Sequence, residues 1–390
     1  MFSKLFDSFL VHYLERFNDH CFTVKIGDNE YTIGDGESEF TVIVNRDIPK
    51  KDLLISAELA LGEAYMRKDI EIEGDLFKAL CVVLGHVGKD SINRKVLSSL
   101  FNAGLKKKDQ KQQVSSHYDL GNEFYKLWLD ETMSYSCAYF KHENDSLKDV
   151  QYQKVHHILD KLYLKEGMTL LDIGCGWGFL LIEAARKYGV KGYGCTLSEE
   201  QWKKGQERIK EYGLEGQVEI ELIDYRDVAA SGRTFDRIVS IGMLEHVGRP
   251  NFPLYMEDAS EMLKDGGLFL LHYISDPSEK ETSAWIRKYI FPGGCLPSLR
   301  EMVSLAYDYD MNVIDVESLR YHYYKTLMHW YNNFQGVREQ VEAKRGSEFV
   351  RMWDLYLCGC AAGFYIGNMD LHQILMTKGV TNELPLTRWY

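Results

Sequence analysis

The stretch LDIGCGWG, residues 171–178, decides the fold. An apolar strand pattern ends in Asp172 and is followed by Gly174, Gly176 and Gly178, after which a helical pattern begins. Glycines let the backbone turn sharply and approach a ligand closely, and the helix behind them presents unpaired N–H groups at its N-terminus. The stretch therefore predicts a loop that binds a nucleotide-like ligand.

The spacing of these glycines is GxGxG, whereas nicotinamide dinucleotide sites carry GxGxxG. The next strand ends in CTLSEEQ, where Thr196, Ser198 and Gln201 could contact ribose, while the two glutamates favour the start of a helix. Asp172, at the carboxyl edge of its strand, could hold a cationic ammonium group or order the loop. A dinucleotide site and a purely structural turn are the alternatives.

Apolar strand-like runs alternate with amphipathic helical patterns around this loop. The predicted strands are residues 169–173, 191–195, 218–222, 235–240 and 267–273, and the predicted helices are residues 180–188, 199–212 and 253–263. Strands separated by helices of this length imply a parallel sheet covered on both faces, so the predicted fold class is α/β. After the third strand, Asp224 and Tyr225 could supply a polar contact and a stacking face for adenine.

The first 105 residues follow a different pattern. Helical periods at residues 2–17, 51–65, 75–85 and 91–101 surround short strands at residues 22–26 and 40–44, which predicts a small α+β domain. The charged run GLKKKDQKQQ lacks an apolar anchor and is typical of a linker. We therefore expect domains at residues 1–105 and 115–390, joined by residues 106–114.

Past Tyr273 the strand–helix alternation breaks into an insertion and two long helical patterns, residues 324–343 and 346–363. Long insertions near strand ends usually shape a substrate pocket. We expect these segments to shape the pocket of the domain at residues 115–390.

Composition excludes several classes of protein. The net charge of −12 argues against a nucleic-acid partner. The apolar runs are far shorter than the roughly 20 residues that cross a bilayer, and acidic residues interrupt any signal-peptide core near the start. The eight cysteines show neither CxxC nor zinc-ligand spacing, so we expect reduced thiols, no metal site and a cytoplasmic location.

Three further fragments place Cys137, Glu245 and His272 at the mouth of the predicted sheet. The region from His117 to Gly379 resembles the cyclopropane-fatty-acid synthase family, which includes the mycolic acid cyclopropane synthases. The motifs SHYDLGN, YSCAYF, LDIGCGWG, DRIVS, EHVG, LLH and IFPGGCLPS occur here in the order of that family. The first 105 residues resemble the extra domain of the bacterial branch that acts on phospholipids.

This resemblance implies a Rossmann-like class I methyltransferase domain with a mainly parallel seven-stranded sheet, and S-adenosylmethionine as the cofactor. It places eight residues around that cofactor: Tyr118 and Ser136 near the methionine carboxylate, Gly174 and Gly176 along the methionine, Thr196 and Gln201 at the ribose, and Asp224 and Tyr225 at the adenine. The implied substrate is the cis double bond of an unsaturated phospholipid acyl chain, and the implied assembly is a homodimer.

Addition of a methyl group to an alkene places two requirements on the site. An isolated alkene has no proton to lose before it attacks a methyl sulfonium, so methyl addition leaves a carbocation that needs a dry, aromatic-lined pocket. A base must then remove a proton to close the ring. The resemblance implies that this base is bicarbonate, held by Cys137, Glu245, His272, Tyr323 and the backbone of Ile274. Alternatively, Cys137 is a buried small hydrophobic residue, and His272 is a histidine at a strand end whose hydrogen bonds are satisfied within the protein.

Two other functions compete with this one. A related methyltransferase could form a methyl-branched lipid or methylate a small amine, and a non-catalytic lipid carrier or cofactor sensor could use the same scaffold. The retained Glu245 and His272 favour ring formation.

For transient docking on the inner face of the membrane we point to Lys106, Lys107, Lys108 and Lys111 beside the amphipathic first helix. The alternative is that these lysines belong to a solvated linker.

Overall fold

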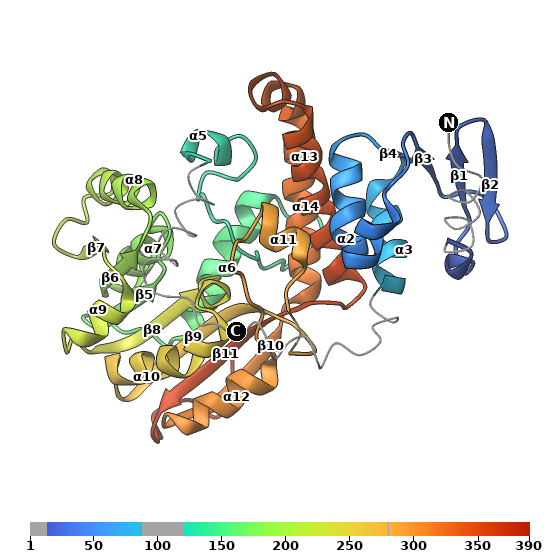
Figure 1. The fold of residues 1–390 in the computed structure, drawn as a ribbon. Coiled ribbons are helices and arrows are strands. Elements are labelled where there is room, and N and C mark those ends of the chain that lie inside the picture. The colour runs from blue at the N-terminus through green and yellow to red at the C-terminus, as the bar shows by residue number, and fades with distance from the viewer. Residues whose placement is uncertain (1–13, 88–119, 280) are drawn as a thin grey trace. The chain divides into compact units, whose positions relative to one another are not determined.

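A computed structural model of the chain describes residues 14–87, 120–279 and 281–390 (Figure 1). The chain divides into two compact units, each assembled from segments far apart in the sequence. The first unit draws on residues 1–99, 282–290 and 327–368, and the second on residues 100–281, 291–326 and 369–390. The expected boundaries at residues 105 and 115 lie outside the described residues, so the domain assignment stays a prediction.

The second unit is built on a seven-stranded sheet with the strand order β10-β11-β9-β8-β5-β6-β7. Five neighbouring strands, from β9 to β7, are parallel, whereas β11 runs antiparallel to both of its neighbours. This confirms the predicted α/β class and the mainly parallel seven-stranded sheet. The strands are β5 Thr169–Ile173, β6 Lys191–Thr196, β7 Val218–Leu222, β8 Phe235–Ile241, β9 Leu263–Ser275, β10 Met311–Ser318 and β11 Asp370–Lys378.

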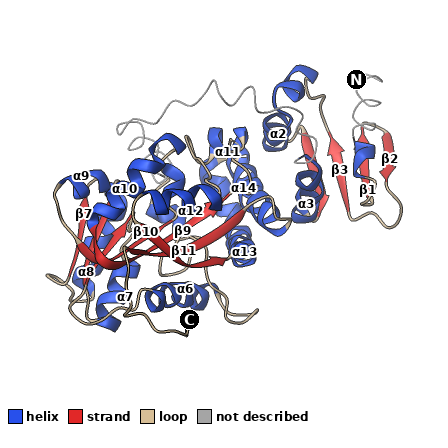
Figure 2. Cartoon of the chain, turned by 90° about the horizontal axis from the view of Figure 1, so that it is seen from below, coloured by secondary structure: helices blue, strands red, loops and turns tan. Residues whose placement is uncertain are grey.

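Helices cover both faces of this sheet (Figure 2). One core joins the sheet to α9, α10 and α12, and a second core joins its other face to α6, α7 and α8. The helices are α6 Leu147–Lys161, α7 Phe179–Tyr188, α8 Glu199–Glu211, α9 Tyr225–Ala230, α10 Phe252–Met262 and α12 Leu299–Asp308, with the short α5 Asn122–Tyr125 and the 3₁₀ turns η3 Leu244–His246 and η4 Arg249–Asn251. The carboxyl ends of the parallel strands are left to form a site.

The predicted elements of this unit are confirmed, with shifts at their ends. The largest shift is at β9, which begins at Leu263 and not at Gly267, because Leu263 already pairs with Phe235 of β8. Among the described residues, no helix is both long enough and apolar enough to cross a membrane.

The first unit holds a four-stranded sheet with the order β2-β1-β3-β4. Its elements are η1 Glu15–Phe17, β1 Phe22–Ile26, β2 Asn29–Ile33, β3 Phe40–Val44, α2 Lys50–Met66, β4 Ile70–Gly74, α3 Leu76–Val87, α11 Ala284–Tyr289, α13 Arg320–Arg345 and α14 Ser347–Tyr365, of which α13 begins in the second unit. Arg351 of α14 donates to the carbonyls of Tyr65 and Ile70 at 2.6 and 3.0 Å. These bonds tie a C-terminal helix to N-terminal elements.

The predicted strands at residues 22–26 and 40–44, the helices that became α2 and α3, and the two long C-terminal helices are confirmed. The strands β2 and β4 were not predicted, because NEYTI and IEIEG carry charged residues that interrupt an apolar run. Of the predicted helix at residues 2–17, only η1 falls within the described residues, and the one at residues 91–101 lies outside them.

Candidate active site

One pocket lies at the carboxyl edge of the parallel strands, where a doubly covered α/β sheet binds its ligands. Its lining includes eight of the nine residues predicted to bind the cofactor: Ser136, Asp172, Gly174, Gly176, Thr196, Gln201, Asp224 and Tyr225. The ninth, Tyr118, lies outside the described residues. The fold therefore brings these predicted residues together from β5 and the glycine loop, the end of β6, the start of α8, the loop before α6 and the start of α9.

The glycine loop needs its glycines for two separate reasons. Gly174, Gly176 and Gly178 have φ values of 81°, 55° and 78°, in the left-handed region that favours glycine. A Cβ on Gly174 would lie 2.8 Å from Cγ of Met243, whereas a Cβ on Gly176 would meet nothing within 4 Å. Gly178 is the N-cap of α7, so the N-terminus of that helix adjoins the pocket.

The ribose-side residues form a small network at the start of α8. The hydroxyl of Thr196 donates to Oε1 of Gln201 at 2.9 Å, and the N–H of Ser198 donates to the Thr196 hydroxyl at 3.2 Å. Ser198 also caps α8 by accepting from the backbone N–H of Gln201. The network fixes the Gln201 amide at the pocket wall.

At the predicted adenine end, Asp224 caps α9 and is bound by its neighbour. Nε and Nη2 of Arg226 donate to the two carboxylate oxygens of Asp224 at 2.8 and 2.7 Å. The ring of Tyr225 is buried and packs edge-on against Tyr255, with ring centres 5.5 Å apart. The Asp224 carboxylate is thus already engaged, and an adenine contact through it would share that carboxylate with Arg226.

Glu245 sits in η3, directly after β8, and is buried. The backbone N–H of Ile274 donates to its Oε1 at 2.7 Å, while its Oε2 is buried without a hydrogen-bond partner among the described residues. Burial raises the pKa of Glu245 to about 7. The Ile274 N–H therefore orients the carboxyl group, which keeps one oxygen for a ligand and titrates near neutral pH.

His272 lies on β9 at the same edge of the sheet, paired with Ile241 of β8. The amide Nε2 of Gln373 lies 3.1 Å from its Nδ1, and its Nε2 is buried without a partner among the described residues. Burial lowers the pKa of His272 well below its usual range, so the ring is neutral. With the Gln373 amide donating to Nδ1, the proton of the neutral ring is on Nε2.

The thiol of Cys137 and the backbone N–H of Tyr323 both lie near the carbonyl oxygen of Leu319. Sγ of Cys137 lies 3.2 Å from the carbonyl oxygen of Ala138 and 3.9 Å from that of Leu319, which also accepts from the backbone N–H of Tyr323 at 3.0 Å. Burial raises the pKa of the Cys137 thiol well above its usual range. A thiol in that state is a donor and not a nucleophile.

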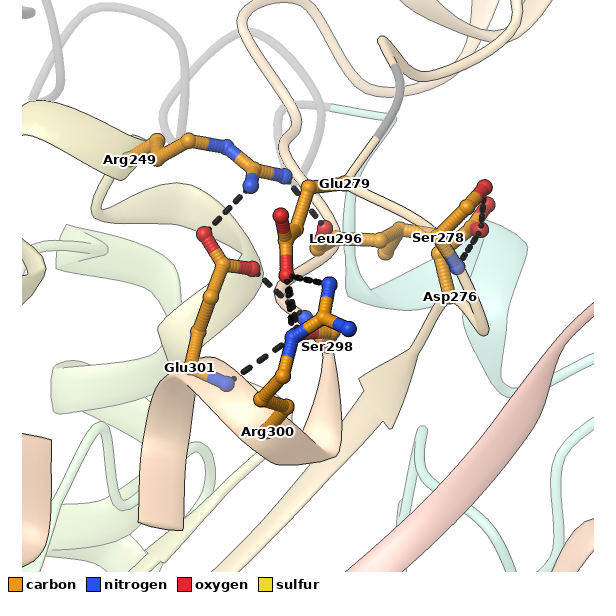
Figure 3. A network of polar contacts seen from close by, with 8 residues as sticks. All are labelled: Arg249, Asp276, Ser278, Glu279, Leu296, Ser298, Arg300 and Glu301. Atoms are coloured by element: carbon orange, nitrogen blue, oxygen red, sulfur yellow. Dashed lines mark hydrogen bonds and ion pairs between the residues drawn. The ribbon is translucent and has the colours of Figure 1, made fainter. Parts of the chain in front are cut away.

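A polar network joins Arg249, which follows the turn that carries Glu245, to Leu296, Ser298 and Glu301 (Figure 3). The guanidinium of Arg249 pairs with the carboxylate of Glu301 and donates to the carbonyl of Leu296 at 3.0 Å. Glu301 in turn closes a capping box with Ser298 at the start of α12. The backbone N–H of Cys295, in the same loop, donates to the Glu245 carbonyl at 2.9 Å. The IFPGGCLPS motif thus braces the backbone of Glu245.

Three residues with roles here escaped prediction. Lys154 of α6 lines the pocket, Gln373 of β11 orients His272, and Arg249 braces the turn. A lysine within QYQKVHHILDK reads as part of a solvent-facing stripe, and a glutamine in a strand gives no signal without knowledge of its neighbour. For Arg249, the only signal in the sequence was its position directly after the EHVG motif.

The strand order, the glycine loop and the pocket at the carboxyl edge define a class I S-adenosylmethionine-dependent methyltransferase. Residues 105–374 match the family model described as mycolic acid cyclopropane synthetase, and residues 9–89 match a domain of unknown function. The chain belongs to the mycolic acid cyclopropane synthetase family.

Relatives agree with this assignment. A probable fatty acid methyltransferase of Pseudomonas putida is 37% identical over 380 residues, covering 94% of this chain and 94% of that protein. The cyclopropane-fatty-acyl-phospholipid synthase of Escherichia coli strain K12 is 40% identical over 346 residues, covering 87% of this chain and 88% of that protein. The structure of the mycolic acid cyclopropane synthase CmaA1 with SAH and CTAB matches with a TM-score of 0.63 at 34% identity, covering 69% of this chain and 98% of that chain. The predicted family is confirmed.

Proposed function

We propose that the chain is a cyclopropane-fatty-acyl-phospholipid synthase, which adds a methylene group from S-adenosylmethionine to the cis double bond of an unsaturated phospholipid acyl chain. The similarity to the Escherichia coli synthase, which extends over 87% of the chain, supports the substrate class. The pocket at the carboxyl edge supports the cofactor, because its glycine loop, its buried acid and its ribose-side amide suit a zwitterionic nucleoside.

The observation that carries the proposal is a pair of orphaned polar atoms. Oε2 of Glu245, in the turn that follows β8, and Nε2 of His272, on the neighbouring strand β9, are both buried and lack partners among the described residues. Buried polar groups are nearly always paired, so the two atoms fit a small polar ligand with one donor and several acceptors. Bicarbonate has this combination of groups. Its O–H can donate to the Glu245 carboxylate, and its other oxygens can accept from the His272 N–H.

The cofactor, when bound, supplies an electrophilic methyl group. The chain's own residues then have two tasks: to keep water out, since water would trap a carbocation as an alcohol, and to hold the base that takes the last proton. Glu245, His272, Cys137 and Tyr323 are all buried, which meets the first task. The carboxylate form of Glu245 strengthens the basicity of a bicarbonate ion hydrogen-bonded to it, which meets the second.

The proposal extends to the assembly and location of the enzyme. We infer a homodimer that docks transiently on the inner face of the membrane from the water side. The segment that we expect to dock, which includes Lys106–Lys108, lies outside the described residues.

The experiment is to express the chain in a host that lacks such an enzyme and to analyse its phospholipids by mass spectrometry before and after ozone treatment. We expect acyl chains heavier by one CH₂ that ozone no longer cleaves, because a cyclopropane has no double bond. A gain of CH₂ with ozone cleavage retained would instead identify a methyl-branched product. That second candidate is kept because the chain is 37% identical to a probable fatty acid methyltransferase of Pseudomonas putida.

A further inference from the structure

Lys154 is a buried cation on the wall of the cofactor pocket. Its side chain lies on α6 and is 3% exposed, and its Nζ donates to the hydroxyl of Ser136 at 3.0 Å. No carboxylate of the described residues lies within 4.0 Å of it. Lys161, two turns further along the same helix, is also buried but pairs with Glu317 at 2.5 Å and Asp315 at 3.5 Å. The helix therefore carries one neutralised buried lysine and one that faces the pocket.

The carboxylates that act on Lys154 do so only at longer range. Asp130 uses its two oxygens to accept from the N–H and the hydroxyl of Thr132, both at 3.0 Å. Asp172 has a buried Oδ1 without a partner among the described residues. Burial lowers the pKa of Lys154 to about 8 and raises that of Asp172 to about 7. A buried charge without a close partner is costly, which is the state that a complementary ligand relieves.

The need to hold the loop at Ser134–Ser136 does not explain why Lys154 is buried at this position. Gln151, one turn earlier on α6, already holds the loop by donating to the carbonyl oxygens of Ser136 at 3.1 Å and Ser134 at 3.4 Å. Within the described part of the chain, the ammonium of Lys154 bonds only the hydroxyl of Ser136, which also lines the pocket. The position of Lys154 thus serves the pocket and not the loop backbone.

We propose that Lys154 binds the α-carboxylate of the methionine portion of S-adenosylmethionine, beside Asp172, for which the sequence already suggests a contact with the α-ammonium group. The inference rests on the proposed function, since it assigns an additional residue to the same cofactor site. One cation and one anion that line the same pocket without touching each other match the two charges of an amino acid. Ser136, bonded to Lys154, holds the ammonium in place.

The test compares two ligands that differ only in the carboxylate. Isothermal titration calorimetry of the full-length protein at pH 7.5 measures the affinity of S-adenosylhomocysteine and of its decarboxylated analogue, which keeps the amine. The wild type should bind the first ligand at least about tenfold more tightly, because a charge-assisted hydrogen bond is lost with the carboxylate. Lys154→Met should weaken the first ligand about 10- to 100-fold and the analogue less than about threefold.

Gln151→Leu is the matched control, because it removes the bonds to the loop and leaves the ammonium. It should weaken both ligands by the same factor. If Lys154→Met also weakened both ligands equally, the lysine would be structural and the inference overturned. Equal affinity of the two ligands for the wild type would overturn it even if Lys154→Met did not fold. Binding of neither ligand to the folded wild type would overturn the proposed function as well.

Discussion

At the scale of single residues, the proposed reacting centre consists of side chains that the protein holds in otherwise unfavourable states. Glu245 and His272 each keep one buried polar atom without a partner among the described residues. Such groups cost stability unless a ligand pairs with them. Function at this edge of the sheet is therefore expected to oppose stability.

Glu245→Gln tests the catalytic half of this statement. The amide keeps the shape and the bond from Ile274 but cannot hold a negative charge, so we expect the rate of methylene transfer to fall about 100-fold or more. The affinity for S-adenosylhomocysteine should change less than about twofold, because Glu245 lies outside the glycine loop that is predicted to bind this ligand. Steady-state turnover and calorimetry measure the two effects. A turnover within threefold of the wild type would reject Glu245 as a holder of the base.

The same variant tests the cost in stability. Burial raises the pKa of Glu245 from 4.5 to about 7, so the folded state holds this proton more tightly than the unfolded state. That contribution is complete below pH 4.5 and is lost as pH rises through about 7. At pH 8 the free energy of unfolding of Glu245→Gln should therefore exceed that of the wild type by about 2 kcal/mol, and the variant should unfold at a higher temperature. Near pH 4 the difference should vanish, and an equal difference at both pH values would contradict the assigned pKa.

At the scale of elements, the first unit depends on close packing of α11 against α2. A Cβ on Gly62 of α2 would lie 2.5 Å from Cδ1 of Trp285, and the φ of Gly62 is not in the left-handed region. In Gly62→Ala the steric clash should therefore outweigh the gain in helix propensity and destabilise this unit by about 1–3 kcal/mol. Gly85→Ala in α3, where nothing lies within 4 Å, is the control and should be neutral or stabilise by up to about 1 kcal/mol. Denaturant unfolding distinguishes them, and equal effects would argue against the packing.

The elements also show how far sequence reasoning extends. Continuous apolar runs predicted the parallel strands, because strands buried on both faces need no polar alternation. The glycine spacing located the cofactor loop, because only glycine tolerates those dihedral angles. Lys154 and Gln373 could not be predicted, because their roles depend on neighbours 18 residues before and 101 residues before them in the sequence. The family resemblance supplied Cys137 and Tyr323. The contact of Cys137 with the Leu319 carbonyl joins residues 182 positions apart, so residue spacing could not predict it.

At the scale of the whole molecule, a net charge of −12 would repel an anionic bilayer, so attraction must come from a local basic segment. Changing the three lysines at residues 106–108 to glutamate should weaken binding to anionic phospholipid vesicles about tenfold or more. Vesicle sedimentation at low salt measures it. The control makes the same charge change at Lys203, Lys204 and Lys210 of α8. Equal binding of the wild type and the 106–108 variant would reject this segment as the docking site.

The division into compact units could not be anticipated from the order of patterns along the chain. Residues 327–368 follow the catalytic motifs in sequence, yet they group with the N-terminal sheet, because Arg351 and its helix bond to Tyr65 and Ile70. An amphipathic pattern indicates that a helix has a partner but does not say which one.

The central claim is that Glu245 and His272 hold a bicarbonate ion that takes the final proton. The most direct measurement is the rate of cyclopropane formation by the purified enzyme in buffer stripped of carbon dioxide, with and without added bicarbonate. We predict that the rate falls about tenfold or more on removal and returns when bicarbonate is added, with the affinity for S-adenosylhomocysteine unchanged. An undiminished rate in bicarbonate-free buffer would contradict the account.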